Sequence, residues 1–243
     1  MPSVVETIAE AFAQSGIDLG ALGLAWARVM PAVVLVPAFG LRALPAPARA
    51  VVGLAFAASI FPALAQAASG AHGPWPALAL VEVVRGIPIA LAAAVPLWAA
   101  TMAGGVADAL RGSQEMSTAP TVEGRATPLG IPLSLLASAI FLATGGPARV
   151  VKALATAPMP DHPLLAAAND LVGGIVLAVA VGGPLLAASV VIEVTAALVA
   201  RAASPAQVHA LLAPLRTMAT LTVLALVLHR IAAALELALQ SAP

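Results

Sequence analysis

Long apolar runs separated by short polar connections dominate the chain. The runs at residues 86–107, 126–148 and 171–192 contain no Asp, Glu, Lys or Arg, and neither does the run at residues 50–81. A helix rises about 1.5 Å per residue, so about 20 apolar residues cross a hydrocarbon core of about 30 Å. Because the runs are continuously apolar rather than alternating, they indicate helices rather than strands.

This pattern predicts about six hydrophobic helical segments, of which fewer than six need span lipid. We expect them at residues 17–39, 48–68, 77–107, 126–148, 171–192 and 208–235. Polar connections are expected at residues 40–49, 108–128, 149–170 and 193–216. Prolines inside the runs remove backbone donors and are expected to kink the helices; they are Pro62, Pro88, Pro96, Pro132 and Pro184. The predicted fold class is all-α, and since no connection is long enough for a second domain, we expect one domain over residues 1–243.

Composition places these helices in a membrane. Hydrophobic residues make up 61% of the chain and charged residues 9%, against about 25% charged residues in a typical soluble domain. Eleven basic residues balance eleven acidic ones, so no basic surface exists that could hold nucleic acid. The chain has no Cys, which excludes disulfides and thiolate chemistry. Glu6 and Glu10, with no nearby Lys or Arg, are not typical of a cleavable signal, so we expect the N-terminus to be retained.

Four charged residues inside or beside the apolar runs are candidate functional residues. A lone Arg28 facing lipid would cost at least about 2.5 kcal/mol, so it must face protein, water or a partner. Glu82 and Arg85 stand three residues apart, close enough on one helix face to pair. Glu193 ends the fifth run. Each of the four either lines a conducting path or subunit contact, or is a charge at a helix end near the membrane surface.

No pattern of residues predicts catalysis. Nucleophile elbows, zinc-binding HExxH motifs and phosphate-binding loops are absent from the sequence. Asp161 and His162 are adjacent between prolines, which favours a turn over an acid–base pair. We therefore expect no enzyme, no metal and no cofactor.

Several short strings, in order along the chain, resemble one family. They are RVMPAVVLVPAFGLRALPAPAR (Arg28 to Arg49), AGGVADALRG (Ala103 to Gly112), TPLG (Thr127 to Gly130), IFLATGG (Ile140 to Gly146) and SPAQVHALLAPLR (Ser204 to Arg216). Together they resemble the T subunit of the type III secretion export apparatus, whose flagellar counterpart is FliR. Asp108 with Arg111-Gly112, and the pair Gly145-Gly146, look more like the injectisome branch than the flagellar one.

The resemblance implies an architecture and a set of partners. Members form helical hairpins that assemble with R and S subunits in the bacterial inner membrane, beside a U-type switch protein and a V-type export gate protein, around a path for unfolded polypeptides. The loop after Asp108 resembles the plug-like loop of the closed pore; it comprises Arg111, Gly112, Ser113, Gln114, Glu115, Met116 and Ser117. From its chemistry alone this loop is better explained as a plain connector between two apolar helices, and only the resemblance favours a pore constriction.

These observations favour a non-catalytic gating subunit of a protein-export channel. One alternative is a stand-alone secondary transporter or channel with a polar site near Glu82 and Arg85, although such a protein should show an internal repeat and none is visible. A second alternative is an intramembrane enzyme, which the missing motifs disfavour.

Overall fold

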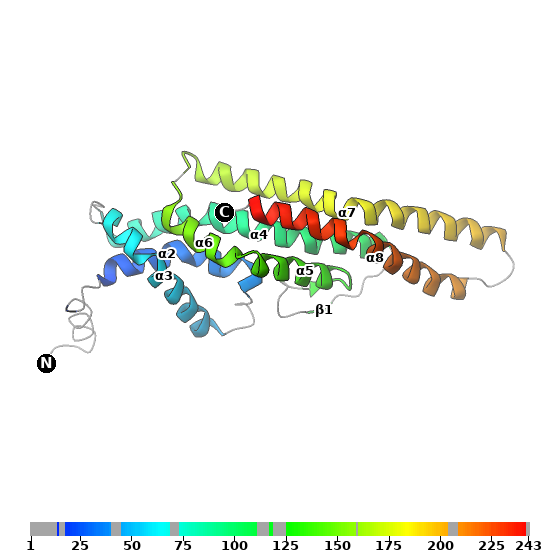
Figure 1. Cartoon of the computed structure of the whole chain (residues 1–243), viewed down its shortest axis with the longest axis horizontal. Helices are drawn as coiled ribbons and strands as arrows, with labels where there is room; N and C mark the ends of the chain where they lie inside the picture. Colours follow the sequence, from blue (N-terminus) through cyan, green and yellow to red (C-terminus); the bar gives the residue numbers. More distant parts are fainter. Residues whose placement is uncertain are drawn as a thin grey trace. The chain divides into compact units, whose positions relative to one another are not determined.

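The computed structural model describes residues 14, 18–39, 45–68, 73–110, 117–118, 125–158, 160–203 and 209–241. Within these residues the fold is all-α, as predicted, and Figure 1 shows its helices in chain order. The helices are α2 (Leu19–Leu35), α3 (Ala46–Ala68), α4 (Trp75–Leu110), α5 (Gly130–Ala143), α6 (Gly146–Thr156), α7 (Pro163–Ala202) and α8 (His209–Ser241). A 3-10 turn, η1 (Pro37–Phe39), follows α2. Two short strands, β1 (Ser117–Thr118) and β2 (Arg125–Ala126), pair antiparallel between α4 and α5.

Four of the described helices, α3, α4, α7 and α8, are long and apolar enough to cross a membrane. The bent pair of α5 and α6 raises the possible number of spans to five. With 36 residues, α4 has a length of about 54 Å, well beyond a hydrocarbon core of about 30 Å. The chain is therefore a multi-pass helical membrane protein, as the sequence predicted.

The predicted boundaries were wrong at three places. The expected span at residues 126–148 is two helices, because Gly145 adopts a left-handed conformation (φ 73°) that ends α5 and Pro147 then opens α6. The expected polar connection at residues 149–170 is helical as far as Thr156 and again from Pro163. The connection expected at residues 193–216 begins only after α7 ends at Ala202.

The first span is also shorter than predicted. α2 has 17 residues and begins at Leu19; the side chain of the preceding Asp18 accepts a hydrogen bond from the Gly20 N–H at 2.7 Å. Asp18 is therefore a helix N-cap rather than a charge inside a span.

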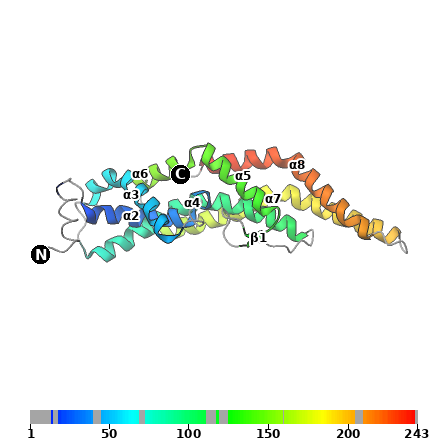
Figure 2. The same ribbon diagram turned by 90° about the horizontal axis from the view of Figure 1, so that it is seen from below.

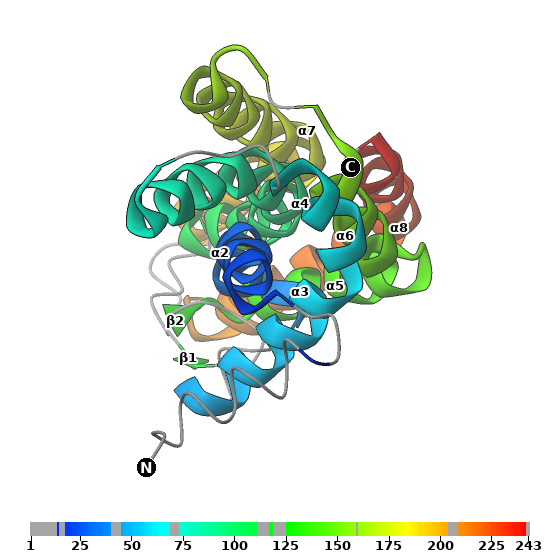
Figure 3. The same cartoon turned by 90° about the vertical axis from the view of Figure 1, so that its left-hand side faces the viewer.

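The chain folds into two compact units. Of the described residues, those up to residue 94 and at 145–170 form the first unit, and those at 95–144 and 171–241 form the second. In the first unit α2, α3 and α6 pack together, and Figure 3 looks along α2 with these neighbours beside it. The indole N–H of Trp26 donates to the Ala50 carbonyl at 3.4 Å, and Gly53 lies against the same indole. Small residues thus let α3 lie close to α2.

In the second unit, glycines allow helix backbones to approach closely. A Cβ on Gly174 would meet Val95, and one on Gly182 would lie 3.3 Å from Ala103. The contacting residues follow in the same order along α4 and α7, and they are separated by the same number of residues on both helices. The two helices therefore run parallel here. α8 packs against α5, and Figure 2 shows these two helices side by side.

One face of α7 is apolar and exposed. It carries branched side chains three or four residues apart, among them Val172, Ile175, Val176 and Val179, each 60% or more exposed. The opposite face is buried at Val181, Leu185 and Ser189. An apolar face of this size suits lipid or a neighbouring subunit rather than water.

Candidate functional site

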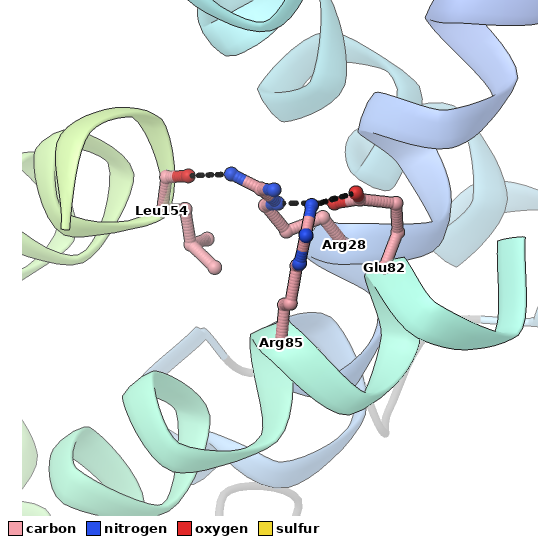
Figure 4. A network of polar contacts seen from close by, with 4 residues as sticks. All are labelled: Arg28, Glu82, Arg85 and Leu154. Carbon is pink, nitrogen blue, oxygen red and sulfur yellow. Dashed lines mark hydrogen bonds and ion pairs between the residues drawn. The ribbon is translucent and has the colours of Figure 1, made fainter. Parts of the chain in front are cut away.

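Three of the four predicted charges come together in the first unit. Arg28 of α2 donates from Nε to Glu82 Oε2 at 2.6 Å, and Arg85 donates from Nη1 to Glu82 Oε1 at 2.6 Å. Glu82 and Arg85 are one helical turn apart on α4, so the predicted pairing within that helix is present. Figure 4 shows the carboxylate of Glu82 between the two guanidinium groups. We call these three side chains the charge cluster.

A backbone carbonyl completes the coordination of Arg28. Its Nη1 donates to the Leu154 carbonyl of α6 at 3.1 Å (Figure 4). In a continuing helix this carbonyl would accept from residue 158, but Pro158 has no N–H and disfavours helical geometry at Ala157. The carbonyl is thus left open at the end of α6, where a positive charge also suits the helix dipole.

Gly86 makes the approach of α2 to α4 possible. A Cβ at this position would collide with the Arg28 carbonyl oxygen and lie 3.2 Å from the Pro31 ring. With no side chain in the way, the α4 backbone lies directly against α2, one turn beyond Glu82. The crossing therefore sets the short distance between Arg28 and Glu82, which are 54 residues apart in the chain.

The cluster is largely shielded from solvent. The side chains of Arg28 and Glu82 are 12% and 13% exposed, whereas Arg85 is 39% exposed. A cavity of about 200 Å³ adjoins the two arginines, between Pro88 of α4 and the end of α6. Removing one member of such a buried pair leaves the other charge uncompensated. This geometry suits a structural link between α2, α4 and α6.

The fourth predicted charge lies in the second unit. Glu193 of α7 forms an ion pair with Arg216 of α8 at 3.1 Å, with both side chains about one third exposed. Arg201, the next cation after Glu193 along the chain, is exposed near the end of α7. The Glu193–Arg216 pair joins the two helices of the last hairpin.

The predicted plug-like loop falls mostly outside the described residues. Arg111, Gly112, Ser113, Gln114, Glu115 and Met116 lie there, and Ser117 begins β1. The two ends of the loop are described. A Cβ on Gly104 would lie 2.6 Å from backbone atoms of Leu129 and Gly130, so α4 and α5 touch backbone to backbone. β1 and β2, drawn as short arrows in Figure 3, pair Ser117 with Ala126 and Thr118 with Arg125.

Sequence reasoning missed two contributors to these sites. Asp108 is fully buried, and its Oδ2 accepts the Leu129 N–H at 2.6 Å. One signal in the sequence could have revealed this contact. It is a carboxylate in the last turn of an apolar helix, one turn after a glycine. The Leu154 carbonyl could be anticipated only from Pro158 four residues later. Asp161 and His162 lie in an exposed bend, which agrees with the predicted turn.

These features define a multi-pass helical membrane protein in which charges on long apolar helices are paired with charges on neighbouring helices. The model of the family described as "Bacterial export proteins, family 1" matches residues 19–242. The chain belongs to this family, which includes FliR and the T subunits of the type III export apparatus. It is therefore a membrane subunit of that apparatus and associates with its other components, and the family is a structural part of the apparatus rather than a known class of enzyme. A comparison with curated proteins finds no match.

Proposed function

We propose that the chain is a gating subunit of the export apparatus in the bacterial inner membrane. It assembles with R and S subunits around a conduit for unfolded polypeptides, next to the U-type switch protein and the V-type export gate protein. Residues 111–117, which we call the gate loop, close this conduit at rest and move aside for a substrate. In this proposal residues 1–243 act as one export-gate domain of the injectisome type.

The close contact between the ends of α4 and α5 is the observation that carries this proposal. Gly104 lies against the backbone of Leu129 and Gly130, so the two ends of the intervening segment are held together. The pairing of β1 with β2 brings two further points of that segment together. A loop with a fixed base can occupy a narrow passage and return to it after displacement, which a loosely attached connector cannot do.

The paired charges have a supporting role in the proposal. The charge cluster ties α2, α4 and α6 together, and the Glu193–Arg216 pair ties α7 to α8. We propose that these ties keep the hairpins rigid beside the passage while the gate loop moves. The exposed part of Arg85 would then contact a neighbouring subunit or the passage itself.

The geometry favours this role over a stand-alone transporter with a solute site at Glu82 and Arg85. Both carboxylate oxygens of Glu82 accept hydrogen bonds from arginines. A transported cation would have to displace a guanidinium from each oxygen that it used. No specific observation favours transport, so we put forward no second function.

Deletion of residues 112–118 tests the proposal. Because a constriction blocks ions only while it stays narrow, we expect the deletion to raise the ion leak of the reconstituted complex without abolishing assembly. The leak is measured as dissipation of an ion gradient across vesicles that contain the chain with its R and S partners.

Two controls accompany the deletion. Replacing residues 112–118 by seven Gly and Ser residues keeps the length of the loop and changes its side chains. This variant therefore shows whether the leak depends on the loop's length or on its side chains. A double variant in the exposed bend, Asp161→Ala with His162→Ala, should leave the leak at the wild-type level. Unchanged conductance of an assembled complex that carries the deletion would contradict the proposal.

A further inference from the structure

We propose that one exposed face of α8 is a docking surface for a membrane helix of a partner subunit, and that a carboxylate of that helix pairs with Arg230. The inference goes beyond the proposed function, because it concerns assembly and does not depend on the gate loop. The surface, which we call the α8 stripe, comprises Leu226, Arg230, Ala233 and Leu237, and all four residues are exposed.

The α8 stripe lies opposite the buried face of the same helix. Its residues are spaced four, three and four apart, which places them on one side of a helix with 3.6 residues per turn. Ile231, Leu235 and Leu239 are at most 2% exposed and lie on the other side. In contrast, Leu226 and Leu237 are 69% and 70% exposed. α8 therefore has one apolar face buried within its own unit and a second that stays exposed.

Arg230 excludes lipid as the surroundings of this second face. The apolar span of α8 is Pro214–Gln240, and any 20 consecutive residues within it include Arg230. Because about 20 residues cross the hydrocarbon core, Arg230 lies within the core wherever the core falls along the span. The nearer end of the span is ten residues away, or about 15 Å. An exposed guanidinium at that depth is strongly disfavoured in lipid.

The described part of the second unit supplies no counterion for Arg230. It contains three acidic residues. Asp108 is fully buried and bonded to a backbone N–H, and Glu193 is paired with another arginine. Glu236 lies six residues beyond Arg230 and thus on another side of α8, where it is hydrogen-bonded to a glutamine. The counterion must therefore come from outside these residues.

The apolar neighbours of Arg230 favour a protein helix over a water-filled passage. Leu226 lies about one turn before Arg230, and Leu237 about two turns after it. Large exposed apolar side chains suit a protein contact rather than water, and a small residue such as Ala233 lets a second helix approach closely. A helix that covers the leucines also removes Arg230 from water, so it must bring a charge partner. The occupant that fits is an apolar helix with one Asp or Glu.

Arg230→Glu tests the charge on the α8 stripe. The substitution would set two carboxylates against each other in the contact, which weakens binding strongly. We expect at least about a tenfold loss of the R and S subunits that co-purify with the full chain. Arg230→Lys keeps the charge but loses the paired donors of the guanidinium, so its loss should be smaller. The matched control is Arg201→Glu, which changes an exposed arginine near the end of α7 and should leave co-purification unchanged.

A charge swap keeps the test decisive if Arg230→Glu lowers assembly through misfolding. Each Asp and Glu in the membrane helices of the R and S subunits is replaced by Arg, one at a time, in complexes that contain the Arg230→Glu chain. We expect one of these replacements to restore co-purification towards the wild-type level. A misfolded chain would not be restored in this way, so recovery identifies the partner subunit and its carboxylate together.

Two probes at Ala233 show what covers the α8 stripe in the assembled complex. A photoreactive amino acid at this position should form a cross-link to one partner subunit. Because the chain has no Cys, Ala233→Cys provides a single thiol in the subunit. A water-soluble maleimide should not label this thiol in the assembled complex, since the partner helix covers it.

Four results would overturn the docking surface. They are wild-type co-purification of the Arg230→Glu chain, failure of every charge swap to restore it, a cross-link only to lipid or to a second copy of the chain, and labelling of the Ala233→Cys thiol in the assembled complex. The last result would mean that the α8 stripe faces a water-filled passage. None of these results involves the 112–118 deletion, so the docking surface and the gate loop are tested separately.

Discussion

Glu82→Gln is expected to prevent stable assembly of the chain. The substitution removes the single negative charge between Arg28 and Arg85 and leaves the 12% exposed guanidinium of Arg28 without an ionic partner there. Breaking one side of a buried ion pair costs about 3–5 kcal/mol, a large fraction of the stability of most proteins. The measurement is the fraction of chain that co-purifies with R and S subunits, together with the thermal midpoint of any complex that forms.

A double variant distinguishes charge burial from packing. Arg28→Met with Glu82→Met replaces the pair by apolar side chains of similar length, a change that is often neutral or stabilising in buried sites. Assembly should therefore recover towards the wild-type level. The explanation would be wrong if Glu82→Gln assembled normally, or if the double variant were worse than the single one.

Gly104→Ala is expected to have the second largest effect. The added Cβ would lie 2.6 Å from the Leu129 carbonyl carbon and from the N and Cα of Gly130. These are backbone atoms, which cannot rotate away as a side chain can, so α5 must move off α4. Overpacking of this kind costs about 1–3 kcal/mol and occasionally more. We expect a lower thermal midpoint of the complex and an increased ion leak, since the base of the gate loop is displaced.

The neighbouring glycine is the matched control. The nearest atom to a Cβ on Gly105 is Thr127 Oγ1 at 3.8 Å, an ordinary van der Waals contact. In a helix interior Ala is more favourable than Gly by about 0.8–1.0 kcal/mol, so Gly105→Ala should keep or improve the stability of the complex. Equal thermal midpoints for the two variants would mean that the close crossing of α4 and α5 does not form.

Hydropathy predicted the membrane helices well but not where they end. A continuous apolar run identifies the residues that avoid water, and those residues do lie in α3, α4, α7 and α8. The polar connection expected at residues 149–170 includes Arg149 and Lys152, but both lie on α6, a helix with polar and apolar faces. Likewise Glu193 lies within α7 because it pairs with Arg216 of α8.

The candidate sites were predictable only where their residues are close in sequence. The spacing of Glu82 and Arg85 predicted their pairing, and the cost of burying Arg28 predicted that it must face something other than lipid. The sequence could not tell that Arg28 meets the same carboxylate, because that contact depends on the crossing of α2 and α4 at Gly86. The buried hydrogen bond of Asp108 was missed for the same reason, since its partner is a backbone N–H 21 residues away.

Ion conductance of the loop-deleted chain, reconstituted with and without R and S subunits, tests most directly whether the passage is formed by the assembly and closed by this subunit. We predict conduction when the partner subunits are present and none from the chain alone. Equal conduction by the isolated chain, or a closed passage in the loop-deleted assembly, would contradict the account.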